Sequence, residues 1–412
     1  MKRLFSFLLV LLFMFSIILT AASCNQAQTN TPEASENATP SDAAPTEKPT
    51  EKPTEKPTEK PTEKPTEKPT EKPEVTPDED PLSAKEYKIV DSLENFKLFS
   101  NRMVALGDAI TCDFSASGIE FQGYMKGEIK LSLECDRNTY FTVFVNDERV
   151  EERLLVTPDM KEVVLTDLFI PAEYSIRVLK QTEPQWSLAK LYSISLCGTL
   201  YEAPENADYY IEFVGDSITC GYGNLGNSSS PNPGTALWED GTKAYAFLTA
   251  QALGADANIV GCSGIGIDKG WTDFSEKDFY PANSYYRDTA TPLTNNTRVP
   301  DLVVINLGTN DASRGSTEAE FKKGVKDLIE SIREFYGKDM PVLWVCGMMG
   351  GGRSEWTLPV LEEMGGEAAG IYCAELPSNG QGAGGHPSLS AQEDSATRLV
   401  SFIQSKNILP AK

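Results

Sequence analysis

The sequence predicts an α/β domain, a parallel sheet covered by helices on both faces, that follows an all-β domain of antiparallel strands. Two observations divide the chain near Tyr201. Short runs of alternating apolar and polar residues recur before it, and apolar strands alternate with helix-length amphipathic stretches after it. The two folded domains are therefore predicted at residues 82–200 and 201–412.

The all-β domain is predicted to be a β-sandwich or jelly roll. Its runs are rich in β-branched and aromatic residues and are separated by Asn-Asp and Pro-Asp turns; they lie at 118–121, 127–133, 140–145 and 174–178. Alternation with period two is typical of strands that bury one face. No residue of this half stands out as a candidate for chemistry.

The second domain alternates predicted strands with predicted helices. The strands are expected at 209–214, 257–260, 302–307, 342–346 and 368–372, and the helices at 243–253, 318–336 and 390–404. Ligands of such sheets bind beyond the carboxyl ends of the strands. The functional residues are therefore expected at that edge.

The first 23 residues have the features of a secretory signal. A basic start precedes an apolar run, Leu4–Leu19, that is shorter than the ~20 residues of a membrane-spanning helix. The small residues that lead into Cys24 resemble the lipobox of bacterial lipoproteins, with Ala21 where leucine is more common. This resemblance implies a cell-surface lipoprotein anchored to the membrane at Cys24; ordinary cleavage near Ala22 is the alternative, and both imply export.

Residues 24–81 are predicted to be a disordered linker. Large apolar residues are scarce, and Thr-Glu-Lys-Pro is repeated seven times between Thr46 and Pro73. Such a segment buries too little apolar surface to offset its ordering entropy. With proline at every fourth residue, an extended polyproline II chain at ~3.1 Å per residue reaches on the order of 170 Å. The linker is therefore expected to act as a tether.

Charge and composition exclude several kinds of partner and cofactor. The formal net charge is −23, and no basic stripe of the kind that binds phosphates is evident, so a nucleic-acid partner is not expected. A single histidine cannot build the usual zinc deacetylase site, and the cysteines form no close ligand pair, so no metal or cofactor is expected. Apart from Cys24 there are seven cysteines, expected to be mostly free and buried; Cys220 and Cys262 adjoin the proposed site but lack a second histidine to activate them.

Four polar blocks are predicted to meet at the functional edge: Gly215-Asp216-Ser217, Gly261–Gly266, Gly308–Asp311 and Gly384–His386. A serine hydroxyl needs a neighbouring base, and His386 is the only histidine of the chain. Acyl transfer also needs hydrogen-bond donors for the oxyanion, and the N–H groups of Ser217 and Gly264 and the amide of Asn310 are candidates. The pattern predicts a serine esterase with Ser217 as nucleophile and His386 as base.

In these four blocks, residues 201–412 resemble the SGNH (GDSL-type) hydrolase superfamily. The resemblance implies a flavodoxin-like sheet, with Ser217 as nucleophile, His386 as base, and Gly264 and Asn310 completing the oxyanion hole. The alternative readings are a helix N-cap for Ser217, a turn residue for Asn310 and a merely packed ring for His386.

The histidine block departs from the pattern of that superfamily. Most members have an aspartate three residues before the histidine, and this chain has Ala383. Loss of a triad carboxylate that nothing replaces often costs about 10⁴ in rate. We therefore expect a Ser–His dyad, with a backbone carbonyl of residues 381–385 accepting the Nδ1–H; Glu375 and Asp394 are less favoured acceptors.

A β domain joined to an SGNH domain with a dyad is similar to carbohydrate esterase family 2. Further similarity lies in Ala244–Leu248, Leu253–Asp256 and Ser263–Ile267. Over residues 85–412 the resemblance implies removal of acetyl groups from xylan, mannan or glucomannan. A tethered monomer is the default expectation for the oligomeric state. Trp238, Trp271 and Trp356 are candidates for stacking on sugar rings or for packing. A glycan-binding protein with little turnover, and an SGNH lipase or thioesterase, are the competing functions.

Overall fold

The computed structural model describes residues 80–411, except for 233, 272–282, 286–287, 293–297 and 351–352. All described residues belong to one compact unit, Thr70–Lys412. The predicted signal and almost all of the predicted linker lie outside the described residues. Among the helices in the described part of the chain, none is long and apolar enough to cross a bilayer.

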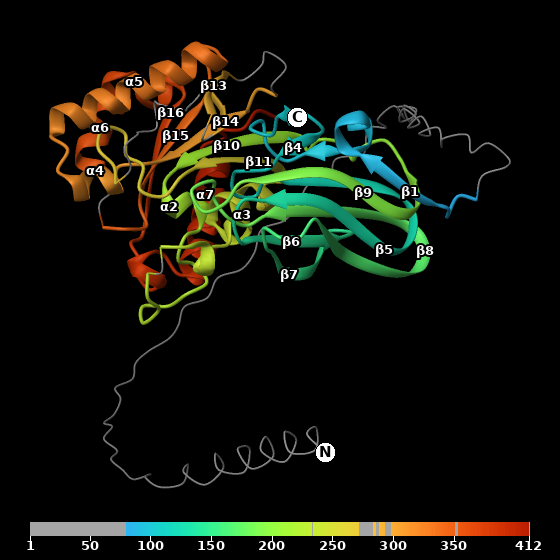
Figure 1. Cartoon of the computed structure of the whole chain (residues 1–412). Helices are drawn as coiled ribbons and strands as arrows, with labels where there is room; N and C mark the ends of the chain where they lie inside the picture. Colours follow the sequence, from blue (N-terminus) through green and yellow to red (C-terminus); the bar gives the residue numbers. More distant parts are fainter. Residues whose placement is uncertain are drawn as a thin grey trace, which may run out of the picture. The chain divides into compact units, whose positions relative to one another are not determined.

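The first half of the described chain is a nine-stranded antiparallel sheet, which confirms the predicted all-β half (Figure 1). Its order is β3-β4-β9-β5-β8-β6-β7, with β1 pairing with β9 and β2 with β5. The strands are β1 Ala84–Lys88, β2 Lys97–Leu98, β3 Ala105–Leu106, β4 Ala109–Thr111, β5 Gly118–Cys135, β6 Thr139–Val145, β7 Glu148–Val156, β8 Glu162–Lys180 and β9 Ala189–Leu200. The finer assignment as a jelly roll stays a prediction.

Two long strands, β5 and β8, allow this sheet to enclose a core of its own. Their pairing shifts register at Met125/Gly127 and at Ile129/Lys130. Such bulges bend a strand and increase its twist. Apolar side chains of the inner face, among them Phe121 and Ile176, are fully buried in one cluster.

The second half contains a five-stranded parallel sheet in the order β11-β10-β14-β15-β16, as the alternation of the sequence predicts. This order is the one found in flavodoxin-like sheets. The strands are β10 Tyr209–Gly215, β11 Ala255–Gly261, β14 Leu302–Asn306, β15 Val342–Gly347 and β16 Ile371–Leu376; a separate pair is β12 Asn283–Tyr285 and β13 Asp288–Pro292.

Helices cover both faces of the parallel sheet (Figure 1). The helices are α2 Ser217–Cys220, α3 Tyr245–Ala252, α4 Thr309–Arg314, α5 Glu318–Tyr336, α6 Ser354–Glu363 and α7 Leu389–Ser405. Every residue of β14 is buried, as expected for a strand covered on both sides. Val304 packs in the cluster under α3 and α7, and Val303 packs in the cluster under α5 and α6.

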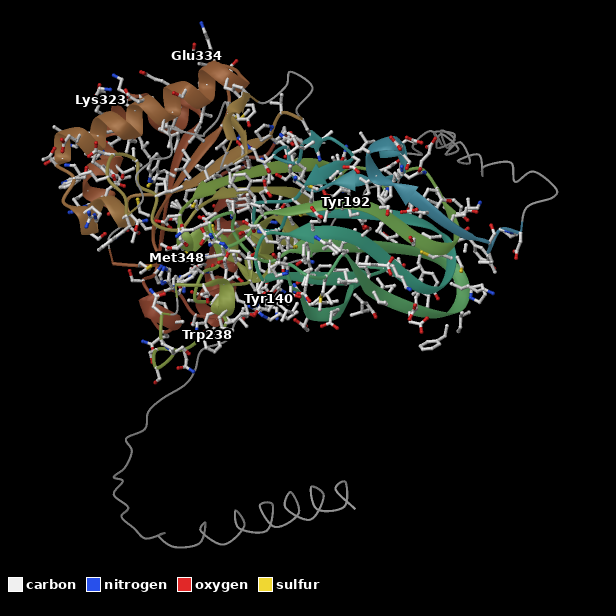
Figure 2. The ribbon with its side chains drawn as sticks, viewed as in Figure 1. Tyr140, Tyr192, Trp238, Lys323, Glu334 and Met348 are labelled. Atoms are coloured by element: carbon white, nitrogen blue, oxygen red, sulfur yellow. The ribbon has the colours of Figure 1, made fainter. Side chains whose placement is uncertain are left out.

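Helix α5 has the bounds that the sequence predicts. Thr317 and Glu320 form a capping box at its start, and Gly337 follows its last residue. Its apolar residues, such as Phe321 and Val325, are buried. Lys323 and Glu334 lie on the side of the helix that faces away from the sheet (Figure 2).

The last strand differs from the predicted range 368–372, which was wrong at both ends. Residues Gly366–Ala369 form a 3₁₀ turn, and Gly370 has a φ of 69°, in the left-handed region. A strand cannot continue through that conformation. Strand β16 therefore begins at Ile371 and runs on to Leu376.

The two halves share a core. Phe99, Phe144 and Leu179 of the β half pack in the same cluster as Ile211 and Phe213 of the parallel sheet. The division into two separate domains at residue 200 stays a prediction.

Candidate functional site

Ser217 and His386 lie together at the carboxyl edge of the parallel sheet. Ser217 is the first residue of α2, directly after β10, and its Oγ lies 2.9 Å from Nε2 of His386. A β-carbon at Gly215 would lie 2.1 Å from Oγ1 of Thr219, so only glycine fits the turn that presents the serine. This is the spacing of a hydroxyl and the base that takes its proton.

The loop before His386 determines where the imidazole lies. Gly384 and Gly385 have φ angles of 61° and 77°, and the N–H of Gly382 donates to the carbonyl of His386 at 2.8 Å. The ring of Tyr222 meets the imidazole edge to face, with centroids 4.9 Å apart. The sequence did not single out Tyr222.

Burial lowers the pKa of His386, and the carbonyls of Ala383 and Gly384 raise it in part. Nδ1 is buried without a hydrogen bond of ordinary geometry to any described residue. The two carboxylates considered from the sequence lie elsewhere: Asp394 pairs with Arg398 at 2.7 Å, and Glu375 lines a neighbouring cavity. Neither carboxylate therefore accepts a hydrogen bond from Nδ1 of His386.

The candidate oxyanion donors surround Ser217. No described residue accepts a hydrogen bond from the backbone N–H of Ser217 or of Gly264. The side-chain amide of Asn310 lies 3.0 Å from Oδ2 of Asp216 and 2.8 Å from the carbonyl of Ile265. The two backbone donors therefore have no acceptor among the described residues, whereas the amide of Asn310 already has two.

Asp216 joins the serine turn to Asn310. Its Oδ1 accepts from the N–H of Ile218 at 3.0 Å, which caps α2, and its Oδ2 accepts from Asn310. The side chain is fully buried, and desolvation, with the nearby charges of Asp311 and Glu183, raises the pKa of Asp216 to about 7. Asp216 is a structural link within the site.

The β half reaches this site, although no residue of that half stands out in the sequence. The segment between β8 and β9 places Glu183 and Trp186 beside the parallel sheet. Glu183 is fully buried and accepts hydrogen bonds from the N–H and the hydroxyl of Ser263. Trp186 stacks on Tyr222 at 5.7 Å. No motif in the sequence marks these residues, because their partners lie far along the chain.

The three candidate tryptophans differ in their surroundings. Trp271 is 64 % exposed, and its backbone N–H donates to the carbonyl of Gly264 at 2.7 Å. Its indole N–H donates to Oγ of Ser313 at 3.0 Å, and the guanidinium of Arg314 lies over its ring. Trp238 ends a 3₁₀ turn and is half-buried. Trp356 lies in α6 and packs against Phe321. The backbone of Trp271 thus contacts the loop of Gly264, while its side chain lies against α4.

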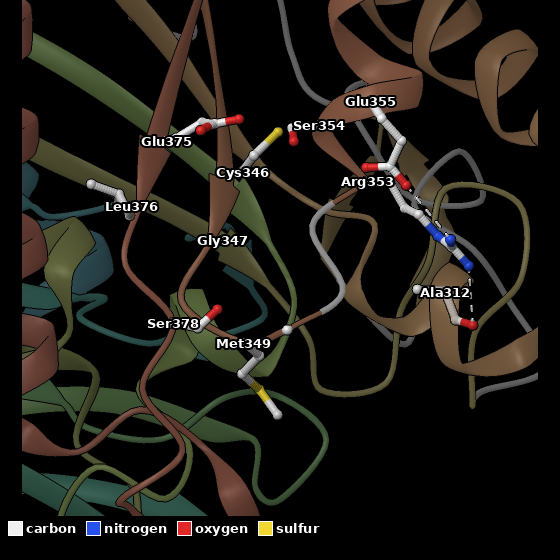
Figure 3. A pocket seen from close by; sticks show the side chains of 11 residues that line it. Ala312, Cys346, Gly347, Met349, Arg353, Ser354, Glu355, Glu375, Leu376 and Ser378 are labelled. Carbon is white, nitrogen blue, oxygen red and sulfur yellow. Dashed lines mark hydrogen bonds and ion pairs between the residues drawn. The ribbon is translucent and has the colours of Figure 1, made fainter.

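A cavity of about 540 Å³ opens at the same edge, beyond β15 and β16 (Figure 3). Arg353 and Glu355 line one side, and Glu375 and Ser378 line the other. Ala312, just after Asn310 in α4, also lines it. The cavity is mostly polar and adjoins the site without including Ser217 or His386.

The seven described cysteines are free, as the sequence predicts. Five are buried and two are half-buried. Burial raises the pKa of Cys220 well above its ordinary value, so its thiol is protonated at neutral pH. Within the described residues, no group of three or more His, Cys, Asp or Glu side chains is placed to hold a metal ion.

Residues 211–350 match the family model of the GDSL-like lipase/acylhydrolases. The chain is 29% identical to a cellulase/esterase of Acetivibrio thermocellus over 310 residues, which are 72% of this chain and 37% of that protein. It is 26% identical to an acetylxylan esterase / glucomannan deacetylase of Cellvibrio japonicus over 322 residues, 72% of this chain and 86% of that one. The chain thus spans little more than a third of the first relative.

A solved structure has the same fold over most of the described chain. It is a family two carbohydrate esterase from Clostridium thermocellum in complex with cellohexaose, 26% identical, with a TM-score of 0.68 over 76% of this chain and 99% of that chain. Residues 211–350 therefore match a GDSL-like hydrolase domain, and the solved structures similar to this chain include family two carbohydrate esterases.

Proposed function

We propose that this protein is a carbohydrate esterase that removes O-acetyl groups from plant cell-wall polysaccharides or their oligosaccharides. The observation that carries the proposal is the 2.9 Å contact between Ser217 Oγ and His386 Nε2 beside the open N–H groups of Ser217 and Gly264. A hydroxyl, a base and oxyanion donors at one point are what ester cleavage requires.

The reaction begins when Ser217 Oγ attacks the acetyl carbonyl carbon and passes its proton to Nε2 of His386. The N–H groups of Ser217 and Gly264, with the amide of Asn310, stabilise the oxyanion of the tetrahedral intermediate. The bond between the acetyl carbon and the sugar oxygen breaks, and the sugar oxygen takes the proton from His386. Water, activated by the same imidazole, then hydrolyses the acetyl-serine ester and releases acetate.

The dyad works without a third carboxylate. The carbonyls of Ala383 and Gly384 favour the protonated ring, which is the form that appears after Ser217 gives up its proton. Their dipoles supply part of the stabilisation that the negative charge of an aspartate supplies in a triad. The tautomer with the proton on Nδ1 is then the one that leaves Nε2 free as acceptor.

The sugar is proposed from the relatives and from the surroundings of Ser217. One relative is named for acetylxylan and glucomannan, and one structural neighbour holds cellohexaose. Trp271 has an exposed side chain whose indole N–H donates to Ser313 of α4, three residues after Asn310, and such a ring can stack on a pyranose. Trp238 and Trp356 stay secondary candidates because they are half-buried.

A protein that binds glycans with little turnover is the second candidate. The observation in its favour is that Nδ1 of His386 has no described hydrogen-bond acceptor of ordinary geometry, which weakens the base. The two functions make opposite predictions for acetate release.

The test compares hydrolysis of p-nitrophenyl acetate and p-nitrophenyl palmitate, and acetate release from acetylated xylan and glucomannan. Carbohydrate esterase activity gives turnover on acetyl substrates alone, and Ser217→Ala abolishes it while binding to glucomannan persists. Faster palmitate hydrolysis would indicate a lipase. Binding of glucomannan without acetate release by the wild type would support the second candidate.

We also propose that the chain is exported, lipid-anchored at Cys24 and held away from the membrane by the Thr-Glu-Lys-Pro segment. The support is the sequence pattern of residues 1–81. Labelled palmitate should be incorporated into the wild type and not into Cys24→Ala, which should be released into the medium. Equal labelling of both would contradict the anchor.

A further inference from the structure

The loop that carries a candidate oxyanion donor is fastened on both sides. This oxyanion loop, Gly261–Trp271, connects β11 to the residues that follow, and its Gly264 has a φ of 83°. On one side Asp311 accepts hydrogen bonds from three consecutive N–H groups, those of Ile267 at 2.9 Å, Asp268 at 2.8 Å and Lys269 at 2.9 Å. The carboxylate is thus a fixed anchor for the far part of the loop.

On the other side the anchor is Glu183 from the β half. Its Oε2 accepts from the N–H of Ser263, and its Oε1 accepts from the hydroxyl of the same serine. Oε2 also lies 3.9 Å from Sγ of Cys220, in the helix that Ser217 begins. One carboxylate therefore contacts both the oxyanion loop and the nucleophile helix.

Glu183 is itself held in place. Its N–H donates to Oε1 of Glu239 at 2.6 Å, and its carbonyl accepts from the ammonium of Lys180 at 3.4 Å. Lys180 also donates to the carbonyl of Asp113 at 2.7 Å, and all of these side chains are buried. The side chains of this network have few alternative positions, because moving any one of them would leave a buried polar group without a hydrogen bond.

We propose that Glu183 is a positioning residue for ester cleavage, which holds Ser263 so that the next N–H, that of Gly264, points at the oxyanion. The inference rests on the proposed function. The peptide that carries this N–H joins Ser263 to Gly264, so holding both the amide and the hydroxyl of Ser263 restricts the directions that this peptide can take. The β half is then part of the catalytic unit, through a residue that touches no substrate.

The experiment measures kcat and KM for p-nitrophenyl acetate in Glu183→Gln, Ser263→Ala and the double variant of the full chain. Loss of one oxyanion donor costs about 10²–10³ in kcat, so a misdirected donor should cost about tenfold. We expect Glu183→Gln to lower kcat by about that factor, with KM within about twofold, because the donor acts on the transition state. Because Glu183 acts through Ser263, the double variant should be no slower than the slower single variant within about twofold.

Affinity for a boronic acid that bonds to Ser217 is a second readout, because it reports the oxyanion site directly. It should weaken in Glu183→Gln by the same factor as kcat, while binding of cellohexaose is unchanged. A purely structural role would lower the yield of folded protein and leave kcat per folded molecule unchanged. The matched control is Glu134→Gln, an exposed carboxylate of the same sheet that pairs with Lys161, and its kcat should equal that of the wild type.

Unchanged kcat in folded Glu183→Gln, or multiplicative losses in the double variant, would overturn the inference while leaving the proposed function intact. A wild type without esterase activity would overturn both. If Glu183→Gln does not fold, Ser263→Ala, which removes a single hydroxyl, decides the matter: a lower kcat supports the inference and an unchanged kcat refutes it.

Discussion

At the scale of single residues, the site depends on how closely two loops approach each other. The loop after α2 and the loop before His386 meet at Gly223, whose carbonyl accepts from the N–H of Ala383 at 2.9 Å. A β-carbon at Gly223 would lie 2.6 Å from the carbonyl of Ala383 and 2.8 Å from Cβ of His386. The position of the imidazole relative to Ser217 therefore depends on the absence of a side chain.

Replacing Gly223 by alanine should displace His386 and lower kcat by at least about tenfold, since small misplacements of a catalytic group cost up to ~10² in rate. Gly107→Ala is the matched control: Gly107 has a similar φ of 68° against 80° for Gly223, and nothing lies within 4 Å of a β-carbon there. Both variants should lose ~1–2 kcal/mol of stability from backbone strain, and only Gly223→Ala should lose activity. Equal kcat values would contradict this account.

The charge state of His386 sets the pH dependence. Burial lowers the pKa of its imidazole below the ordinary value of 6.5, and the neutral ring is the base. As pH rises through the lowered pKa, kcat/KM for p-nitrophenyl acetate should rise and reach its plateau by neutral pH. A profile measured from pH 4 to 8 checks the prediction, and a midpoint above 6.5 would be inconsistent with a desolvated ring.

At the scale of elements, the short helix α2 that begins with Ser217 is capped by a side chain of the site itself. Asp216 caps α2 and also accepts from Asn310, so one side chain sets both the serine turn and a candidate oxyanion donor. Helix α5 is capped in a similar way by Thr317, which has no contact with the site. Removing each cap in turn therefore distinguishes an effect on stability from an effect on activity.

Asp216→Ala and Thr317→Ala should each lower the free energy of unfolding by ~0.5–2 kcal/mol, the usual cost of losing an N-cap. In addition, Asp216→Ala should lower kcat by at least about tenfold, because Asn310 loses an acceptor and the serine turn loosens. Urea denaturation and kcat for p-nitrophenyl acetate measure the two effects. A loss of kcat in Thr317→Ala as large as that in Asp216→Ala would show that activity follows stability alone.

At the scale of the whole molecule, the β half is joined to the α/β half by a core and by buried polar contacts. Phe99, Phe144 and Leu179 fill part of the cluster beneath the parallel sheet. Ser100 Oγ donates to Asn258 at 2.6 Å, and the ammonium of Lys97 lies 2.7 Å from Asp256. Separating the halves would expose apolar surface and leave buried polar groups without partners.

A chain of residues 201–412 alone should therefore fail to unfold cooperatively and should lack esterase activity. Residues 80–412 should unfold in one transition and retain the kcat of the full chain on p-nitrophenyl acetate. Thermal unfolding followed by circular dichroism checks both. An active, cooperatively folded 201–412 fragment would contradict the shared core and the role of Glu183.

The sequence predicted those helices and strands whose characteristic residue pattern lies within the element itself. Helix α5 was placed correctly because its amphipathic pattern runs over its whole length, and the buried strands β10 and β14 were recognised by their apolar runs. The start of β16 was missed because glycines with positive φ look like any other glycine in sequence. The short strands β2 to β4 exist only through their pairing.

The sequence by itself determined the candidate chemistry, since a lone histidine and four polar blocks after predicted strands leave few combinations for a serine hydrolase. Only the tertiary structure decided what supports that pair: the carbonyls at Ala383 and Gly384 near the imidazole, the edge of Tyr222, and Glu183 on Ser263. The physical reason is distance along the chain. A sequence motif consists of residues that are close along the chain. Glu183 and Ser263 are 80 residues apart, and only folding brings them into contact.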